Sequence, residues 1–394
     1  HYSLPVMSCL NKKFDFPSSQ SNDIASSYSY AYHINATLYA KYLRSFSEKL
    51  GVIRREGKVV DVIKRASDNH IEMLVMENGQ RIQADFFIDC SGFKSQLIAK
   101  TLGSEFEDWS HWLPCNSAVA IASELNEAPL SYTKAIAREA GWQWQIPLQT
   151  RMGNGYVYSD TFIDKQQALD TLTANLPGKA LTEPNFLTFK AGKRKHAWLN
   201  NCLAIGLSSG FLEPLESTSI YLIQSAIMKL VDLLPKPENM AVKAKEYNRS
   251  LDMEMERIRD FLILHYHATN RQDSPFWEYC RTMNIPDSLQ QKMQMFKQTG
   301  HIQHYKYGLF LEPSWLAVYI GQGVIPSSYD GRVDQMNSEH YIKAMHKIKS
   351  AVDAKCQQMP DHLEMIKQFC VFGNINNNGL AHASLYGDLS GHNS

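Results

Sequence analysis

The most informative stretch of the chain runs from an apolar strand into an apolar helix, and reads Ala204-Ile205-Gly206-Leu207-Ser208-Ser209-Gly210-Phe211-Leu212-Glu213-Pro214-Leu215-Glu216-Ser217-Thr218-Ser219. The strand ends at Gly206, small residues form a turn, and a helix follows Pro214. Ser217 or Thr218 can cap this helix, whose first N–H groups then point at whatever precedes it. Such a helix start attracts anions, and a halide ion fits it. The alternative interpretation is that Glu216 only complements the helix dipole.

The chain before this stretch predicts a helix followed by strands. Apolar residues between Ala36 and Leu50 have the spacing of an amphipathic helix, and Gly51 is suited to end it. Turn signals at Glu56-Gly57 and Asn78-Gly79 separate the strands that follow. We expect strands at 52–53, 59–63, 70–76 and 86–89. The order is typical of a nucleotide-binding sheet domain.

A second sheet and a helical half are predicted for the rest of the chain. Alternating apolar residues favour an antiparallel sheet over 117–158. Further elements are expected as a helix at 164–176, strands at 186–189 and 197–206, and helices at 219–234, 241–267, 286–298 and 338–359. We therefore predict a mixed α/β fold. Its expected units are 1–100, 101–199, 200–235 and 236–394: part of a cofactor domain, an antiparallel substrate sheet, the return to the cofactor domain, and a helical cap.

Composition excludes several classes of protein. Forty basic residues balance forty acidic ones, so no global charge favours nucleic acid or an anionic membrane as partner. The seven cysteines include no Cys-x-x-Cys pair, which indicates neither a metal site nor a redox dithiol, and free thiols suit a cytoplasmic location. No apolar run reaches the length of a membrane span. The chain begins at His1 with a polar, serine-rich segment, so we expect an N-terminal portion to lie outside it.

Two features of the opening stretch resemble the flavin-dependent tryptophan halogenases. Gly206 and Pro214 have the spacing of the Gly-Asp motif of flavoprotein monooxygenases, but Leu207 replaces the aspartate and Glu-Pro-Leu-Glu-Ser-Thr follows. The resemblance implies that Glu216 is catalytic together with Ser217. It also implies that the backbone amides of Thr218 and Ser219 hold halide, although the family usually has glycine at the second position. The FAD contacts implied in this stretch are Gly206, Leu207 and Ile220.

Two further segments resemble the same family. Trp142, Trp144, Ile146 and Pro147 form its Trp-x-Trp-x-Ile-Pro signature, which lies beside the flavin and is thought to disfavour monooxygenation. By themselves, two tryptophans on one face of a strand also suit a core. The segment Asp89-Cys90-Ser91-Gly92 resembles the turn that closes on FAD in hydroxylases, and Gly92 lets backbone approach a phosphate or ribose. Ser91, Gly92 and Val59 are the FAD contacts that we expect here. The implied fold is the FAD-binding domain of the aromatic-hydroxylase and glutathione-reductase type.

The helical cap contains candidates for binding an aromatic substrate. Tyr266, Phe276 and Trp277 match the family's aromatic walls in spacing, although aromatics on helices also suit a core. His265 stands where the family often has tyrosine. Gln272 stands where a glutamate usually meets the substrate ammonium, and its neutral side chain removes a charge-assisted hydrogen bond. The resemblance implies tryptophan or another indole as the substrate, and the two departures count against free tryptophan and in favour of another indole or a larger aromatic.

The resemblance also implies the reaction and its partners. Reduced FAD from a separate NAD(P)H-dependent reductase, together with oxygen, oxidises chloride or bromide to hypohalous acid, which halogenates an electron-rich aromatic carbon. The family's Gly-x-Gly-x-x-Gly loop and its lysine do not occur before Tyr28, and Lys12-Lys13 has no matching context. A homodimer is compatible with the sequence. The alternatives are a flavin-dependent aromatic monooxygenase and an inactive truncated homologue.

Overall fold

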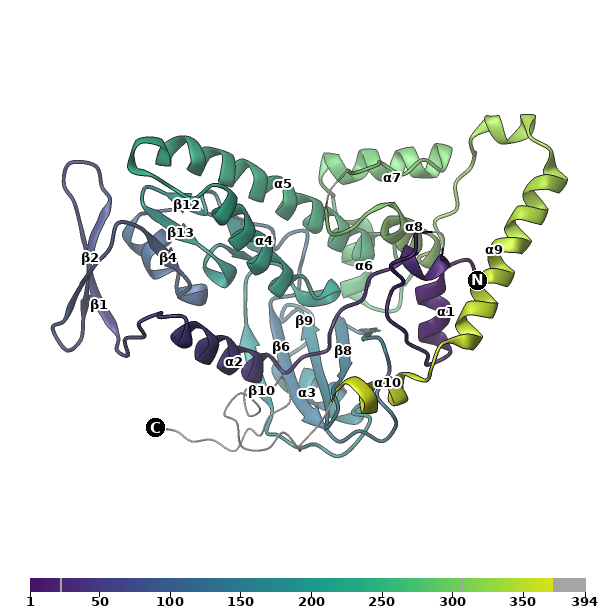
Figure 1. Cartoon of the computed structure of the whole chain (residues 1–394), viewed down its shortest axis with the longest axis horizontal. Helices are drawn as coiled ribbons and strands as arrows, with labels where there is room; N and C mark the ends of the chain where they lie inside the picture. Colours follow the sequence, from purple (N-terminus) through teal and green to yellow (C-terminus); the bar gives the residue numbers. More distant parts are fainter. Residues whose placement is uncertain (22, 307, 371–394) are drawn as a thin grey trace.

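The computed structural model describes residues 1–21, 23–306 and 308–370, and it is a mixed α/β fold in which helices cover several small sheets (Figure 1). Its α-helices are α1 Leu4–Leu10, α2 Ala36–Lys49, α3 Lys165–Ala174, α4 Thr218–Asp232, α5 Met240–His267, α6 Pro275–Thr282, α7 Asp287–Thr299, α8 Glu312–Gly321, α9 Ser338–Gln358 and α10 His362–Phe369. Its strands are β1 Val59–Lys64, β2 Ile71–Met76, β3 Arg81–Gln83, β4 Phe87–Asp89, β5 Phe106–Asp108, β6 Ser117–Ser123, β7 Lys134–Arg138, β8 Gly141–Pro147, β9 Met152–Tyr158, β10 Asn185–Thr188, β11 Gly192–Arg194, β12 Trp198–Leu199, β13 Cys202–Ala204 and β14 Gly210–Phe211.

The long elements expected from hydrophobic periodicity are confirmed. The helix expected at 36–50 is α2, and the helices expected at 219–234 and 241–267 are α4 and α5. Two expectations about strands are wrong. Val52 and Ile53 lie outside any strand, and both are exposed. The single strand expected at 197–206 is a hairpin of β12 and β13, because Asn200 adopts a left-handed backbone conformation that reverses the chain.

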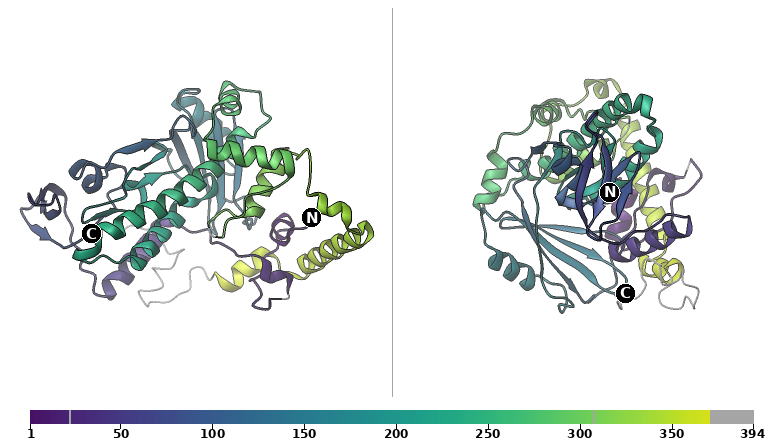
Figure 2. Two further views of the ribbon diagram at one scale, coloured as in Figure 1. Left: turned by 90° about the horizontal axis from the view of Figure 1, so that it is seen from above. Right: turned by 90° about the vertical axis from the view of Figure 1, so that its left-hand side faces the viewer.

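An antiparallel sheet of five strands forms the centre of the molecule, in the order β10-β6-β9-β8-β7. Helix α3 packs against β6 and β9, as seen beside the sheet in Figure 2. Trp144 on β8 lies opposite Gly155 on β9, and a Cβ atom added at Gly155 would fall 2.0 Å from the Trp144 ring. Glycine at this position therefore makes room for a large ring on the face of the sheet.

A smaller sheet, β12-β13-β4, contains the parallel strand pair that positions the candidate site. β13 runs parallel to β4, with Ala204 beside Asp89 at their carboxyl ends. Chain segments more than a hundred residues apart thus end at one edge of one sheet. In open α/β sheets, ligands bind at the carboxyl ends of parallel strands.

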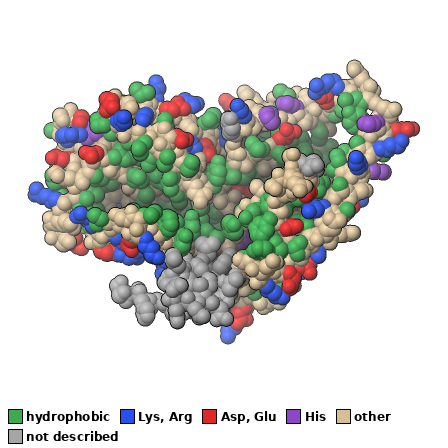
Figure 3. Space-filling view, viewed as in Figure 1, with side chains coloured by type: hydrophobic (Ala, Val, Ile, Leu, Met, Phe, Trp, Pro, Cys, Tyr) green, Lys and Arg blue, Asp and Glu red, His purple; other side chains and the backbone are tan. Residues whose placement is uncertain are grey.

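Helix α5 joins the sheets to the C-terminal helices. Its buried residues include Phe261, Leu262, Ile263 and Leu264, and they belong to the same hydrophobic core as the centre of the five-stranded sheet. Helix α4 has four exposed apolar side chains, those of Ile220, Ile227, Met228 and Val231. Figure 3 shows hydrophobic side chains spread across the middle of the molecule in the same view as Figure 1.

The last helices return to the beginning of the chain. Val352 and Cys356 on α9 pack against Leu4 on α1, and Lys13 forms a backbone bridge with Asp361 just before α10. These helices lie beside the N-terminus in Figure 1. Helices α9 and α10 therefore pack near the N-terminal segment, and the sequence indicated only the first of them, as the helix at 338–359.

Three expected absences can be examined in the described part of the chain. None of its helices is long and apolar enough to cross a membrane. No group of three or more His, Cys, Asp and Glu side chains there could hold a metal ion. The seven cysteines are all free thiols.

Candidate active site

The turns that follow β4 and β13 form one surface at the edge of the small sheet. The Ser208 hydroxyl donates to the backbone carbonyl of Asp89, and the Ser95 hydroxyl donates to the carbonyl of Ser208 over 3.1 Å. The structure thus brings the turn of Ser91 and Gly92 together with the turn of Gly206 and Leu207, four residues that the sequence predicts as FAD contacts. Val59 lies near the turn that follows β4, because its backbone carbonyl accepts a hydrogen bond of 3.0 Å from the side chain of Gln96.

A buried carboxylate holds the first of these turns in shape. Asp89 is 1% exposed and accepts hydrogen bonds from the amide and hydroxyl of Ser91 and from the amides of Leu97 and Ile98, at 2.6–2.9 Å. Gly92 has φ +66°, a conformation that favours glycine, and a Cβ atom added there would meet nothing within 4 Å. The turn is therefore rigid and open to a ligand.

These residues fit an extended cofactor such as FAD. The space beside Gly92 is open, and Leu207 and Ile220 present side chains that are 40% and 38% exposed. Gly206 also has a positive φ, of +73°. Backbone with little side-chain cover, next to exposed apolar side chains, suits the ribose–phosphate chain and the flat ring of a flavin.

The start of α4 is an uncapped helix N-terminus. Ser217 precedes the helix with φ +55°, and its side chain makes no capping hydrogen bond. The expectation that a side chain of Ser217 or Thr218 caps the helix is therefore wrong, because Ser217 at the N-cap position has a left-handed backbone and makes no side-chain cap hydrogen bond, and Thr218 is the first helical residue. Thr218 is fully buried and its hydroxyl has no hydrogen-bond partner among the described residues. Amides without a cap and an unpaired buried hydroxyl together suit a small anion.

Glu216 lies immediately before this helix start and contacts a histidine from α5. His265 Nε2 is 2.9 Å from Glu216 Oε1, and the two side chains are 18% and 36% exposed. His265 Nδ1 lies 2.8 Å from the backbone carbonyl of Phe261. Because a carbonyl can only accept, Nδ1 carries a proton, and the contact at Nε2 needs a further proton shared by the two side chains. The histidine therefore fixes one oxygen of Glu216 and leaves the other for chemistry.

A second carboxyl group, Glu213, is buried beneath this site. Its Oε2 accepts hydrogen bonds from the hydroxyl of Tyr266 over 2.8 Å and from Nε1 of Trp142 over 3.2 Å, while its Oε1 has no partner among the described residues. Burial raises the pKa of Glu213 to about 7, although these two hydrogen bonds oppose the shift. Burial also raises the pKa of the neighbouring Cys115 and Tyr266 well above their usual ranges, so both stay neutral. Glu213 thus links the tryptophan strand to α5.

The four residues expected beside the flavin all lie on β8. The rings of Trp142 and Trp144 are on one face, with centroids 6.1 Å apart. Trp142 is almost fully buried against Glu213, whereas Trp144 and Ile146 are partly exposed. Pro147 ends the strand, and its carbonyl lies 2.9 Å from Nδ1 of His33. This arrangement is compatible with a role of the motif beside the flavin and with a role in the core, because the Trp142 ring packs in the core and the Trp144 ring reaches its surface.

The family of the chain follows from comparison with known proteins. A family model described as tryptophan halogenase matches residues 1–338. The chain belongs to the tryptophan halogenase family. Among curated proteins it is similar to the 7-chloro-L-tryptophan 6-halogenase KtzR of Kutzneria sp. (strain 744), with 34% identity over 350 residues. That match covers 86% of this chain and 67% of KtzR, so the chain spans about two thirds of that relative's length.

Solved structures of flavin-dependent halogenases share the fold. Xcc4156 from Xanthomonas campestris matches with a TM-score of 0.89 and 43% identity, over 94% of this chain and 73% of that chain. BrvH from Brevundimonas sp. BAL3 matches with a TM-score of 0.90 and 39% identity, over 93% and 75%. The expected fold class is therefore confirmed. By family the chain is a flavin-dependent halogenase. The cofactor of that family's chemistry is FAD, and its ion is a halide.

The residues expected to bind a halogenase substrate do not all line one exposed surface. Tyr266, Phe276 and Trp277 are buried and pack on one another, with Tyr266 and Trp277 stacked at a centroid distance of 5.9 Å. His265 reaches Glu216 instead, and Gln272 is exposed in the loop after α5. The three rings therefore form a packed, buried layer, and the hydroxyl of Tyr266 in this layer donates to Glu213.

Each of the two lysines near the N-terminus lies close to a carboxylate. Lys12 Nζ is 4.0 Å from Glu127, and Lys13 Nζ is 2.9 Å from Asp361, beside α10.

No role is predicted for Glu213 from the sequence alone. A signal was present, since Leu212 and Pro214 flank this carboxylate within an apolar segment. Only the tertiary contacts with Trp142 and Tyr266 show that it is buried and bonded.

Proposed function

We propose that this chain halogenates an electron-rich aromatic carbon of tryptophan or another indole, with chloride or bromide as the halogen source. The observation that carries the proposal is Glu216, held by His265 at the uncapped start of α4 next to the unpaired hydroxyl of Thr218. An anion site and a positioned carboxylate within three residues of each other suit the oxidation of a halide and its transfer to a ring.

The site residues have distinct proposed tasks. Gly206, Leu207, Ser91 and Gly92, with Val59 behind them and Ile220 on α4, would hold FAD at the edge of the small sheet. When held by these residues, reduced FAD would supply, together with oxygen, the two-electron oxidising chemistry that hypohalous acid formation from halide requires. The backbone amides of Thr218 and Ser219 hold the halide before this oxidation.

Glu216 acts when the substrate ring has accepted halogen. The ring carbon then bears both halogen and hydrogen. The free oxygen of Glu216 takes that hydrogen as a proton, and the C–H electron pair restores the aromatic ring. Ser217 sets the angle at which Glu216 leaves the turn, because its left-handed backbone ends the turn and begins the helix. His265 orients the carboxyl group through its 2.9 Å contact, and is a positioning residue.

The remaining predicted residues shape the surroundings. Trp144, Ile146 and Pro147 would wall the flavin side, with Trp142 buried behind them against Glu213. This placement is compatible with keeping oxidised flavin species away from the organic substrate. Tyr266, Phe276 and Trp277 form the floor beneath the substrate, and Gln272 offers no charge to an amino-acid ammonium. A separate NAD(P)H-dependent flavin reductase and a cytoplasmic location complete the proposal.

The test is incorporation of bromine. The chain is incubated with indole or tryptophan, bromide, FAD, NADH and a flavin reductase, and products are examined by mass spectrometry for the bromine isotope pattern. Glu216→Gln is expected to lose at least about 100-fold in product, because a general base typically contributes 10²–10⁴-fold. Glu256→Gln is the matched control, since Glu256 is an exposed glutamate on α5. Full activity of Glu216→Gln would contradict its assigned role.

Two competing functions give different results in the same assay. A flavin-dependent aromatic monooxygenase would yield a hydroxylated product in equal amount without halide. An inactive homologue would neither retain FAD nor be stabilised by it against heat. The replacement of the flavin-motif aspartate by Leu207 and the uncapped start of α4 favour halogenation over hydroxylation.

A further inference from the structure

The turn that carries Glu216 begins at a second carboxyl group, Glu213. The two residues lie at the ends of one short 3₁₀ turn, since Glu213 immediately precedes the turn Pro214–Glu216 and Glu216 is its last residue. Glu213 is 0% exposed, and it accepts hydrogen bonds from Tyr266 on α5 over 2.8 Å and from Trp142 on β8 over 3.2 Å. Because Glu213 is fully buried, it can act on Glu216 only through position and charge.

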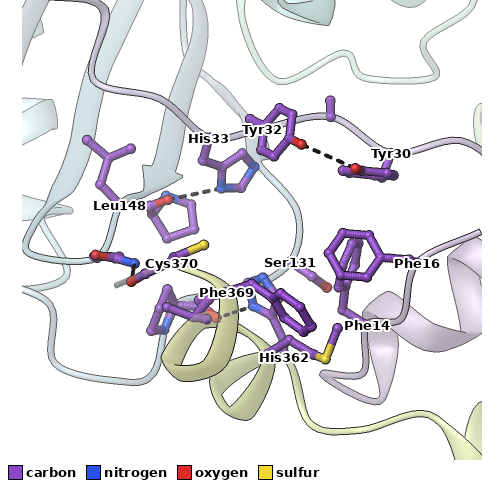
Figure 4. Close-up of a pocket in the computed structure, with 16 residues that line it drawn as sticks. Phe14, Phe16, Tyr30, Tyr32, His33, Ser131, Leu148, His362, Phe369 and Cys370 are labelled. Carbon is purple, nitrogen blue, oxygen red and sulfur yellow. Dashed lines mark hydrogen bonds between the residues drawn. The ribbon is translucent and has the colours of Figure 1, made fainter. Parts of the chain in front are cut away.

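Strand β8 gives Glu213 a fixed point of attachment. Trp142 near the start of the strand is 4% exposed and donates to Glu213. Pro147 ends the strand, and its carbonyl lies 2.9 Å from Nδ1 of His33, which Figure 4 shows at the wall of a pocket. Both ends of the strand are therefore bonded to other segments of the chain, and the hydrogen bond from Trp142 fixes the place of the Glu213 carboxyl group.

Two consecutive residues of α5 meet the two carboxyl groups. Tyr266 donates to Glu213, and the preceding residue, His265, lies with Nε2 2.9 Å from Oε1 of Glu216. His265 is also near enough to Glu213 for a charge on the imidazole to favour the ionised form of that carboxyl group. One imidazole is thus within the electrostatic reach of two carboxyl groups that are three positions apart in the sequence.

The other titratable groups that face Glu213 in the described part of the chain are neutral. They are Cys115 before β6, Tyr266 on α5 and Cys280 on α6. Burial raises the pKa of all three, so none of them carries a charge near neutral pH. His265 is therefore the described group that can offer a positive charge to Glu213.

We propose that Glu213 is a positioning residue for halogenation: in its neutral form it anchors the turn of Glu216 and leaves the imidazole of His265 to Glu216. This role rests on the proposed function, because it acts through the residue assigned there as the base. An ionised Glu213 would place a second negative charge beside the same imidazole, and the two carboxylates would then compete for it. Glu216 would lose part of the contact that orients it toward the ring proton.

The pH at which this competition begins follows from the burial of Glu213. Burial raises the pKa of Glu213 to about 7, although its hydrogen bonds and nearby His265 oppose the shift. The neutral form is therefore present below about pH 7 and is lost above it. Transfer of halogen to the substrate should decrease over the same range. The formation of hypohalous acid should not follow the titration of Glu213, because Glu213 has no part in it.

The titration of Glu213 can be observed without flavin, halide or substrate. In a chain with ¹⁵N-labelled tryptophan, the Nε1–H resonance of Trp142 reports the charge on the carboxyl group that accepts its hydrogen bond, and Trp142→Phe identifies this resonance. We expect it to move with a midpoint near pH 7 in the wild-type chain. In Glu213→Gln it should stay in place between about pH 6 and pH 8.5. A resonance that stays in place in the wild type as well would overturn the proposal.

The effect on chemistry is measured as the fraction of hypobromous acid that is recovered in bromoindole, with the free acid followed by a dye that it bleaches. Between about pH 6 and pH 8.5 this fraction should decrease about 3- to 10-fold in the wild type and less than about twofold in Glu213→Gln. Glu256→Gln, at an exposed glutamate on α5, is the matched control and should repeat the wild-type decrease. Equal decreases in the wild type and Glu213→Gln would refute the role of Glu213. Absence of brominated product at both pH values would instead contradict the proposed function, on which the titration of Trp142 does not depend.

The control for folding uses the amide of the variant and a second substitution. Glu213→Gln keeps an oxygen that can accept from Tyr266 and Trp142, and its melting temperature shows whether it is folded. If it does not fold, His265→Ala supplies the same test. Without the imidazole, an ionised Glu213 has nothing to draw away from Glu216, so the fraction transferred should change less than about twofold over the pH range. A wild-type pH dependence in folded His265→Ala would overturn the proposal.

Discussion

Removal of the imidazole of His265 tests whether this residue acts through Glu216. His265→Ala leaves Glu216 without its partner at 2.9 Å, while the neighbouring aromatic layer stays in place. A hydrogen bond to a charged group contributes about 1.5–3 kcal/mol when buried, and an exposed pair contributes about 0–1 kcal/mol. With side chains 18% and 36% exposed, the pair lies between these limits. We expect a loss of about 1–2 kcal/mol of transition-state stabilisation, which corresponds to about a 5- to 30-fold decrease in kcat.

Steady-state bromination of indole measures this effect, with free hypobromous acid followed by a dye that it bleaches. Because His265 is assigned to the carboxylate and not to FAD or halide, KM for bromide and the total oxidant formed should be unchanged. The fraction of oxidant that reaches the substrate should decrease. His265→Gln can donate a neutral hydrogen bond to Glu216 and should retain an intermediate rate. His267→Ala is the matched control, since His267 also contacts a backbone carbonyl through Nδ1 but lies on another face of α5.

A double-mutant cycle separates positioning from general structural damage. If His265 acts only through Glu216, its replacement should have no further effect in the Glu216→Gln background. Independent, multiplicative losses in the double mutant would refute the reasoning.

The structure makes three further predictions. Burial raises the pKa of Glu213 to about 7, so its neutral form stabilises the fold at low pH, and this stabilisation is lost as the pH rises from the unfolded pKa near 4.5 to about 7. Over that window, Glu213→Gln should therefore gain stability relative to the wild type, by roughly 3 kcal/mol at most. Urea unfolding at several pH values measures this difference, and parallel pH profiles of the two proteins would contradict the prediction. Gly155→Ala places a Cβ atom 2.0 Å from the Trp144 ring and should cost about 1–3 kcal/mol, seen as a lower melting temperature. Gly92→Ala strains a backbone at φ +66° by about 1–2 kcal/mol and should weaken FAD binding in a fluorescence titration, whereas Gly331→Ala, which has open space and no positive φ, should change neither stability nor FAD affinity.

Local sequence patterns predicted the elements that are long and periodic. Helices α2, α4 and α5 bury a regular stripe or core, and their spacing shows this. Shorter elements were not predicted: α1 and α6, for example, have seven and eight residues and too few turns to establish a period. The break between β12 and β13 also escaped prediction, because it depends on the left-handed conformation of Asn200 within an otherwise strand-like run.

The candidate site was predictable only where its residues are neighbours in sequence. The run from Gly206 to Ser219 indicates an anion site with a carboxylate because its members lie on one turn and one helix start. The contact between Glu216 and His265 joins positions 49 residues apart, whereas the sequence placed His265 only through the family resemblance, at the substrate. Burial of Glu213 was equally hidden, since it depends on Trp142 and Tyr266 from two other elements.

Glu213 and Glu216 show how one short segment can give two carboxyl groups different chemistry. Glu216 is partly exposed and contacts an imidazole, whereas Glu213 is fully buried and surrounded by neutral donors. Burial raises the pKa of Glu213 to about 7 although its hydrogen bonds and nearby His265 oppose the shift, so Glu213 can hold a proton at neutral pH. Its Oε2 bonds both Trp142 on the strand beside the proposed flavin and Tyr266 on the helix beneath the proposed substrate. A change in the protonation of Glu213 would therefore alter its contacts with β8 and with α5 together.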